Sequence, residues 1–250
     1  MPLGPNQSYL AKFNNHVLPG YVQSESFDSS LHISPHYGAY IDGSNSEDLG
    51  LANKTVTVRL KVWEKDYLTC KEQIELAATM LRSVRGRFAP LYVGYTDRYY
   101  PAMVNSIKAE KQVGSSVKIA EYEATFECKP WLTNDTAHTL TGTGLIDTDQ
   151  VSRTLANGSQ SPTVVTVTGT DVTISGYTDT GEFTGFISVS GTVASLVIDS
   201  ANFTATQNGE NMNNNMLSVD YQLNVGVGKT NFLITGASSC TIDYYDRWYL

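Results

Sequence analysis

Apolar and polar residues alternate strictly along the segment AEYEATFEC, residues 120–128. One row holds small, aromatic and sulfur side chains, while the other holds Glu121, Glu123, Thr125 and Glu127. A period of two predicts a β-strand with one buried and one exposed face. Because Pro130 lacks a backbone N–H, we expect the strand to end by Lys129. We place a domain boundary after residue 132.

A second strand and one helix are predicted upstream of this segment. Residues 54–65 alternate, with Val56, Val58, Leu60 and Val62 in one row and Thr57, Arg59, Lys61 and Trp63 in the other. A helical spacing follows at Cys70, Ile74, Ala77, Leu81 and Val84. Thr69 and Glu72 have the spacing of a capping box, and Gly86 is placed to end the helix.

The first 132 residues therefore predict an α+β domain, an antiparallel sheet or barrel with one helix. Further strands are expected at residues 91–95 and 103–111, with residues 114–116 as a turn. Residues 1–50 read as extended segments and turns. A single helix against antiparallel strands fits this fold class.

Beyond residue 132 the chain predicts an antiparallel β-sandwich in a mostly β protein. Short candidate strands occupy residues 163–168, 172–175, 183–189, 193–199, 217–225, 231–235 and 240–245. We expect turns between nearly all of them at Gly169, Gly176, Gly191, Asn208-Gly209, Gly226, Gly228 and Gly236. Regular short strands without a helical window are typical of sandwiches.

Charge also separates residues 1–132 from residues 133–250. Of the 17 basic and 25 acidic residues, 14 of each kind lie in the first segment, which leaves 3 basic and 11 acidic residues in the second. The whole net charge of -8 therefore lies in the second segment. Such an acidic chain, with no stripe of basic residues, is a poor candidate for binding nucleic acid.

Few residues suggest chemistry. Cys70, Cys128 and Cys240 are distant in sequence and form no CxxC pair, so we expect buried thiols rather than disulfides. His32 and His36 have a metal-ligand spacing only on a helix, which Pro35 disfavours. With no secretory signal and no run of about 20 apolar residues, we expect synthesis in a cytoplasm and no membrane insertion.

Two sequence patterns imitate catalytic or binding motifs. The segment GVGKT, residues 226–230, suggests a phosphate loop, but Leu223 replaces the required glycine and a strand is expected to follow. Asp147 with Asp149, and Asp243 with Asp246, form carboxylate pairs that we interpret as solvated rather than as acid and base or calcium ligands. We predict no catalytic residue, no cofactor site and no metal site.

Aromatic residues leave alternatives open. The C-terminal Tyr244, Tyr245, Trp248 and Tyr249 are expected to dock against the sandwich itself, the first domain or another subunit. Tyr177, Phe183 and Phe186 fit either the sandwich core, which we favour, or a surface that stacks on sugars.

The order of several segments resembles the distal tail proteins (Dit) of long-tailed bacteriophages, over essentially the whole chain. These segments are FNNHVLPGYV, Asp42-Gly43, AEYEATFECKPWL, NGSQSPTVVTVTG, LVIDSANFTATQNGENM, VGVGKTNFLITG and IDYYDRWYL. The resemblance implies a ring-forming, tail-tube-like domain at 1–132 and a galectin-like β-sandwich at 133–250. True galectins bind sugar through a set of His, Asn, Arg and Trp residues. That set has no counterpart in residues 134–250.

The resemblance further implies a structural virion protein without catalysis, located at the distal end of the phage tail. It would form a homo-hexameric ring that joins the tail tube to the tail hub or tip, with DNA passing through the lumen without specific binding. The alternative is a carbohydrate-binding module for host adhesion, in which the sandwich binds sugar through Tyr177, Phe183 and Phe186.

Overall fold

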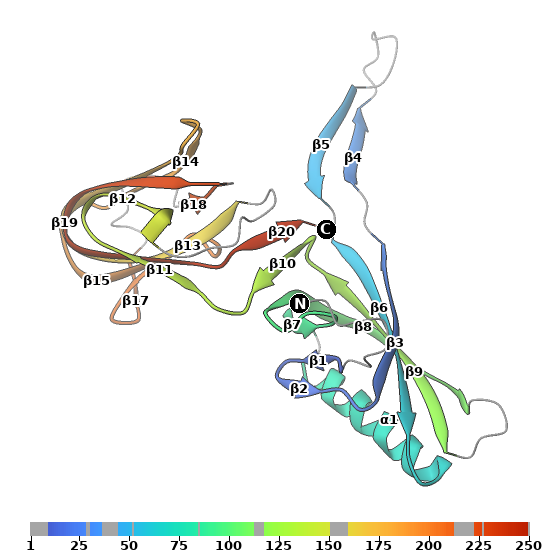
Figure 1. Ribbon diagram of the computed structural model, residues 1–250. Helices are drawn as coiled ribbons and strands as arrows, with labels where there is room; N and C mark the ends of the chain where they lie inside the picture. Colours follow the sequence, from blue (N-terminus) through green and yellow to red (C-terminus); the bar gives the residue numbers. More distant parts are fainter. Residues whose placement is uncertain are drawn as a thin grey trace. The chain divides into compact units, whose positions relative to one another are not determined.

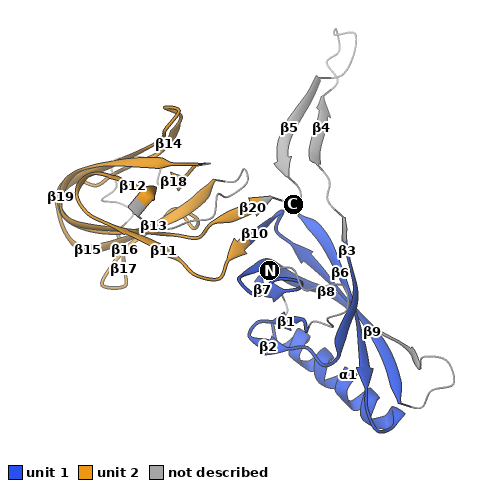
Figure 2. Cartoon of the chain, viewed as in Figure 1, with its two compact units in different colours: residues 1–132, 250 blue, residues 133–249 orange. Residues whose placement is uncertain are grey.

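The chain divides into two compact units in a computed structural model. The structure describes residues 10–28, 31–36, 45–51, 53–84, 86–112, 118–150, 160–212, 223–226 and 228–249. Unit 1 comprises residues 1–132 with residue 250, and unit 2 comprises residues 133–249 (Figure 2). Within the described residues, no helix has the length and apolarity needed to cross a membrane.

Unit 1 is built on a sheet with the strand order β2-β1-β7-β8-β9-β6-β3 (Figure 1). Neighbouring strands along this order are antiparallel. The strands are β1 (Lys12–Phe13), β2 (His16–Val17), β3 (Tyr21–Asp28), β6 (Lys54–Trp63), β7 (Ala89–Tyr92), β8 (Arg98–Gln112) and β9 (Ile119–Cys128). β4 (Leu31–His36) and β5 (Asn45–Leu51) form a separate two-stranded ribbon, and β10 (Trp131–Asn134) pairs with β8 and with β20 (Arg247–Tyr249).

The alternation predicted for residues 54–65 and 120–128 is confirmed by β6 and β9. The two strands pair without a register shift from Lys54↔Cys128 to Trp63↔Ile119. Every second residue on each strand is buried, including Val58, Leu60, Tyr122 and Phe126. Apolar area removed from water contributes roughly 25 cal/mol per Å², so this shared face stabilises the centre of the sheet.

Helix α1 (Tyr67–Arg82) packs against β6, β8 and β9 with the residues its spacing predicted, Cys70, Ile74, Ala77 and Leu81. The predicted cap is wrong. The helix cap lies three residues earlier, at Asp66, which accepts hydrogen bonds from the Thr69 backbone N–H at 2.8 Å and from its hydroxyl at 2.9 Å. These bonds lower the pKa of Asp66, and the carboxylate satisfies a donor that the first helical turn leaves open.

Unit 2 is an antiparallel β-sandwich, as the sequence predicts. Its core contains residues from β13, β14, β15 and β19, including Val165, Ile187, Leu196 and Phe232. The strands are β11 (His138–Thr141), β12 (Gly144–Asp147), β13 (Ser161–Thr178), β14 (Phe183–Ser188), β15 (Thr192–Asp199), β16 (Thr204–Gln207), β17 (Glu210–Asn211), β18 (Asn224–Val225) and β19 (Thr230–Tyr244), with a 3₁₀ turn at Thr148–Gln150. The predicted strand at 217–225 lies mostly outside the described residues.

The two longest strands each cross both layers of the sandwich, a feature that the sequence did not predict. The first half of β13 pairs with β15 and with residues 239–244 of β19, while its second half pairs with β14 and with residues 230–235 of β19. Figure 1 shows β19 turning back on itself. The expected turns at Gly169, Gly176 and Gly236 are therefore wrong, because these glycines lie inside continuous strands.

Gly169 and Gly236 allow this bend because the two backbones touch there. A Cβ on Gly169 would lie 2.3 Å from the Gly236 carbonyl oxygen, and one on Gly236 would lie 2.5 Å from that of Asp171. Gly236 also has a φ of +74°, which favours glycine. Strands that switch sheets at a bulge or bend form the corners of packed sheets. The predicted Asn208-Gly209 turn is confirmed, since it joins β16 to β17 with φ values of 53° and 81°.

The bend predicts unequal costs for two glycine substitutions. Gly236→Ala adds a backbone clash to a positive φ and should lower the free energy of unfolding by about 3 kcal/mol. Gly191→Ala is the matched control, because its φ is +75° but a Cβ there meets nothing within 4 Å. Gly191→Ala should lower the free energy of unfolding by about 1 kcal/mol. Urea unfolding measures both variants. If the two substitutions lowered the free energy of unfolding equally, the close backbone contact at Gly236 would be contradicted.

Candidate functional site

The candidate nucleophiles and metal ligands do not converge. Among the described residues, no group of three or more His, Cys, Asp or Glu side chains is arranged to bind a metal ion. The side chains of His32 and His36, on β4, lie outside the described part. All three cysteines are buried and free of disulfides, as expected, and burial raises the pKa of Cys128 and of Cys240 to about 12. These two thiols therefore stay protonated at neutral pH.

Lys229 of the GVGKT segment is held by aspartates. Its Nζ lies 2.7 Å from Asp149 Oδ2 and 3.0 Å from Asp147 Oδ2. The hydrogen bond from Lys229 lowers the pKa of Asp147, and both aspartates raise the pKa of Lys229. β19 begins directly afterwards at Thr230, so the strand that the sequence analysis expected after this segment is confirmed.

The interpretation of the other carboxylate pair as solvated is wrong for Asp246, which is buried with Oδ2 2.9 Å from His138 Nε2. Asp243 instead accepts a hydrogen bond from Thr139 at 2.6 Å. The two carboxylates therefore have separate partners, and His138, which the sequence did not mark, is the residue next to Asp246.

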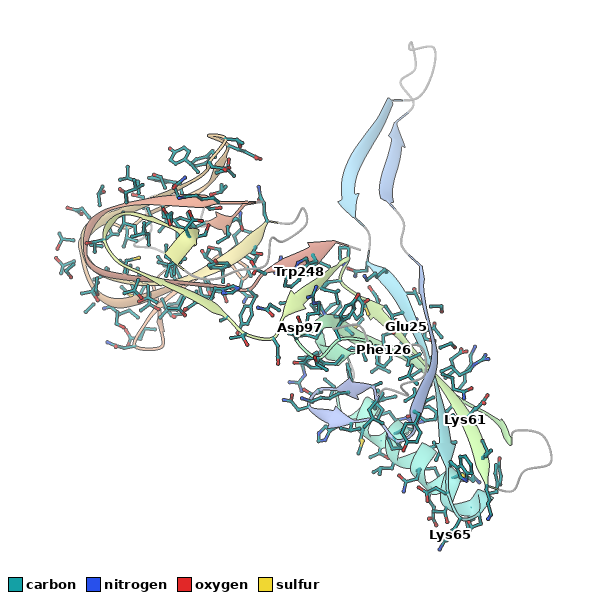
Figure 3. All side chains as sticks on the ribbon, viewed as in Figure 1. Glu25, Lys61, Lys65, Asp97, Phe126 and Trp248 are labelled. Carbon is teal, nitrogen blue, oxygen red and sulfur yellow. The ribbon has the colours of Figure 1, made fainter. Side chains whose placement is uncertain are left out.

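The face of the unit 1 sheet opposite α1 carries a ladder of paired polar groups. Arg59 lies 3.5 Å from Glu123 and Lys61 lies 3.9 Å from Glu121, each across the β6–β9 pair. Farther along β9, beyond Thr125, the Asn53 amide donates to Glu127 at 2.7 Å. Figure 3 labels Lys61 on this polar face and Phe126 in the core. Pairing balances the charges of the face, although each exposed pair adds little stability.

A groove of about 380 Å³, lined by both polar and apolar side chains, opens at the end of β6 in unit 1. Its walls come from β2, the start of β3, the end of β6 and helix α1, with Val17, Tyr21, Trp63, Leu76 and Met80 among the lining residues. Trp63 is 68% exposed and Tyr21 is 54% exposed. Large apolar side chains that are exposed in a cluster often mark a surface that binds another molecule.

One sheet of the sandwich in unit 2 exposes aromatic side chains on its outer surface. Tyr177 on β13 and Phe183 on β14 are paired across the strands, with ring centroids 5.5 Å apart, and are 43% and 56% exposed. The expectation that these two rings fill the core is therefore wrong. Their outward direction follows from the alternation, because Gly176, Thr178 and Thr184 are the buried neighbours. We call this outer surface the aromatic face.

The C-terminal aromatics divide between buried and exposed positions. Tyr244, on β19, is buried and its ring lies 5.2 Å from that of His138. Trp248 is buried, whereas Tyr245 is 43% exposed. The side chain of Tyr249 lies outside the described part.

Comparison with known proteins identifies the fold. No family model matches the sequence, and no curated protein matches it. The chain superposes on the Dit protein (gp 19.1) of SPP1, described as a paradigm of the hub adsorption apparatus in phages that infect Gram-positive bacteria. That match has a TM-score of 0.70 and 15% identity and covers 95% of this chain and 98% of that one.

The phage P2 baseplate in its activated conformation with Ca matches with a TM-score of 0.47 and 8% identity, over 96% of this chain and 91% of that chain. The match to SPP1 Dit shows that the chain has the Dit fold, and the resemblance expected from the sequence is confirmed at that level.

Burial of the cysteines predicts a stability loss in alkaline solution. In the unfolded chain a thiol ionises near pH 9.0, whereas Cys128 and Cys240 in the folded chain ionise near pH 12. Their contribution to stability is complete below pH 9.0 and is lost as the pH rises towards 12. Urea unfolding at pH 8 and pH 10.5 should show this decline, and Cys240→Ala should show a smaller one. An identical decline in the variant would contradict the assignment to Cys240.

Proposed function

We propose that this protein is a structural subunit of a phage tail tip, a distal tail protein that assembles into a hexameric ring. The ring joins the tail tube to the tail hub or tip and lets DNA pass through its lumen. Residues 1–132 form the ring as a tail-tube-like domain, and residues 133–250 form a galectin-like sandwich. The observation that carries the proposal is the match of the whole chain to SPP1 Dit.

The polar face of unit 1 is suited to line a lumen. DNA is a dense polyanion that binds clustered Lys and Arg side chains. On this face each of Arg59 and Lys61 has a glutamate beside it. Arg59 and Lys61 are thus neutralised in place, which would limit sticking of the phosphates during passage. The role needs no catalysis and no cofactor.

The edges of the unit 1 sheet and the groove at the end of β6 supply surfaces for subunit contact. β2 and β3 end the strand order, so within the described part of the chain their outer edges have no further partner in this sheet. Open strand edges are templates for pairing with another chain. Trp63 and Tyr21 lie close to the β3 edge and offer apolar surface that a neighbouring subunit can cover.

This arrangement predicts that charges placed in the groove prevent assembly. The wild-type chain should give a light-scattering mass near six times its 27.4 kDa. Trp63→Asp and Leu76→Asp should give monomers of unchanged fold, because burying an unpaired carboxylate in an interface opposes association. Both side chains are exposed in the single chain, so the substitutions should not unfold it.

Leu145→Asp is the matched control, since Leu145 is 72% exposed but belongs to unit 2. It should leave the ring mass intact. A wild-type monomer that stays monomeric when the tube or hub protein is added would argue against the ring. Loss of assembly in the Leu145 control alone would move the subunit contact to unit 2.

A further inference from the structure

We propose that the aromatic face of unit 2 binds a neutral saccharide. The face lies on four adjacent strands, β12, β19, β13 and β14. One row across these strands contains Asp147, Asn231, Tyr177 and Phe183. The next row contains Leu145, Leu233, Ser175 and Phe186. Aromatic, polar and apolar side chains are thus interleaved on the exposed outer surface of one sheet.

The rings provide the apolar half of a sugar site. Tyr177 and Phe183 contact each other and expose their remaining surface, and Leu233, two residues along β19 from Asn231, is 48% exposed. A pyranose has C–H faces that pack on aromatic rings, whose large and rigid surfaces are ordered at little entropic cost. Sites built on strands are also held more precisely than sites on loops.

Hydrogen-bonding groups lie beside the rings and are available. The side-chain amide of Asn231 and the hydroxyl of Ser175 have no hydrogen-bond partner within the described residues. At the edge of the same row, Lys229 is fixed between Asp147 and Asp149. A fixed group such as the Lys229 ammonium can bind a sugar hydroxyl without first having to be ordered.

Charge and composition favour a neutral saccharide over other occupants. Asp179 and Glu182 lie in the turn that joins β13 to β14, next to Phe183, and residues 133–250 carry the net charge of -8. This field opposes anionic glycans and nucleic acids. Protein interfaces are depleted of charged side chains at their centre, whereas here the charged Asp147 shares a row with the rings.

The test is binding of the full-length chain to defined glycans by isothermal titration. The neutral probes are cellohexaose, chitohexaose, xylohexaose and a soluble galactan, and the acidic probe is polygalacturonate. At least one neutral probe should bind, and polygalacturonate should not. Tyr177→Ala and Asn231→Ala should each weaken that binding about tenfold, the scale of losing an anchoring side chain.

Tyr245→Ala is the matched control, because Tyr245 has the same 43% exposure as Tyr177 but lies outside the aromatic face. Its affinity should equal that of the wild type. The proposal is overturned if no neutral probe binds at millimolar concentration, or if binding survives Tyr177→Ala and Asn231→Ala together. The ring mass of the same variants is a separate readout, so failure of saccharide binding is distinct from failure of the ring.

Discussion

The two-residue alternation along the longest strands is the constraint on which both units depend. In unit 1 it gives β6 and β9 one apolar side, on which α1 packs, and one polar side, where Arg59 meets Glu123. A register slip of one residue would exchange the two sides, so burial fixes the register. The polar ladder and the core are therefore two consequences of one pairing.

In unit 2 the same rule acts through a change of phase. The buried positions of β13 are odd-numbered before the bend, as at Val165 and Val167, and even-numbered after it, as at Val172 and Ile174. The bend at Gly169 and Gly236 brings both sets into one core. Because it also continues β13 and β19 into the second layer, it creates the sheet whose outer surface carries Tyr177 and Phe183.

The sequence predicted most elements, because alternation and helical spacing are local. It placed the β6–β9 strands, the buried side of α1, the Asn208-Gly209 turn and the burial of all three cysteines correctly. It read β13 and β19 as two strands each, because a phase change at a glycine looks like a turn until the partner strand is known. Asp66 was missed as a cap because Thr69 and Glu72 matched a familiar spacing.

Surfaces were harder to predict than cores. The exposure of Trp63 could have been predicted, because Trp63 lies in the same row of β6 as Arg59 and Lys61. An aromatic residue in an exposed row indicates a contact surface. The exposure of Tyr177 and Phe183 could not be predicted, because an aromatic ring in a short strand fits the core or the surface equally well. Their exposure follows from the pairing of β13 with β14, which is tertiary information.

We propose that the two sides of the unit 1 sheet have different places in an assembled ring. Electron cryomicroscopy of particles formed by the full-length chain tests this most directly. The expected result is a closed ring in which Arg59, Lys61 and their glutamates face the axis and α1 lies away from it. A ring with α1 lining the axis, or one closed through unit 2, would contradict it.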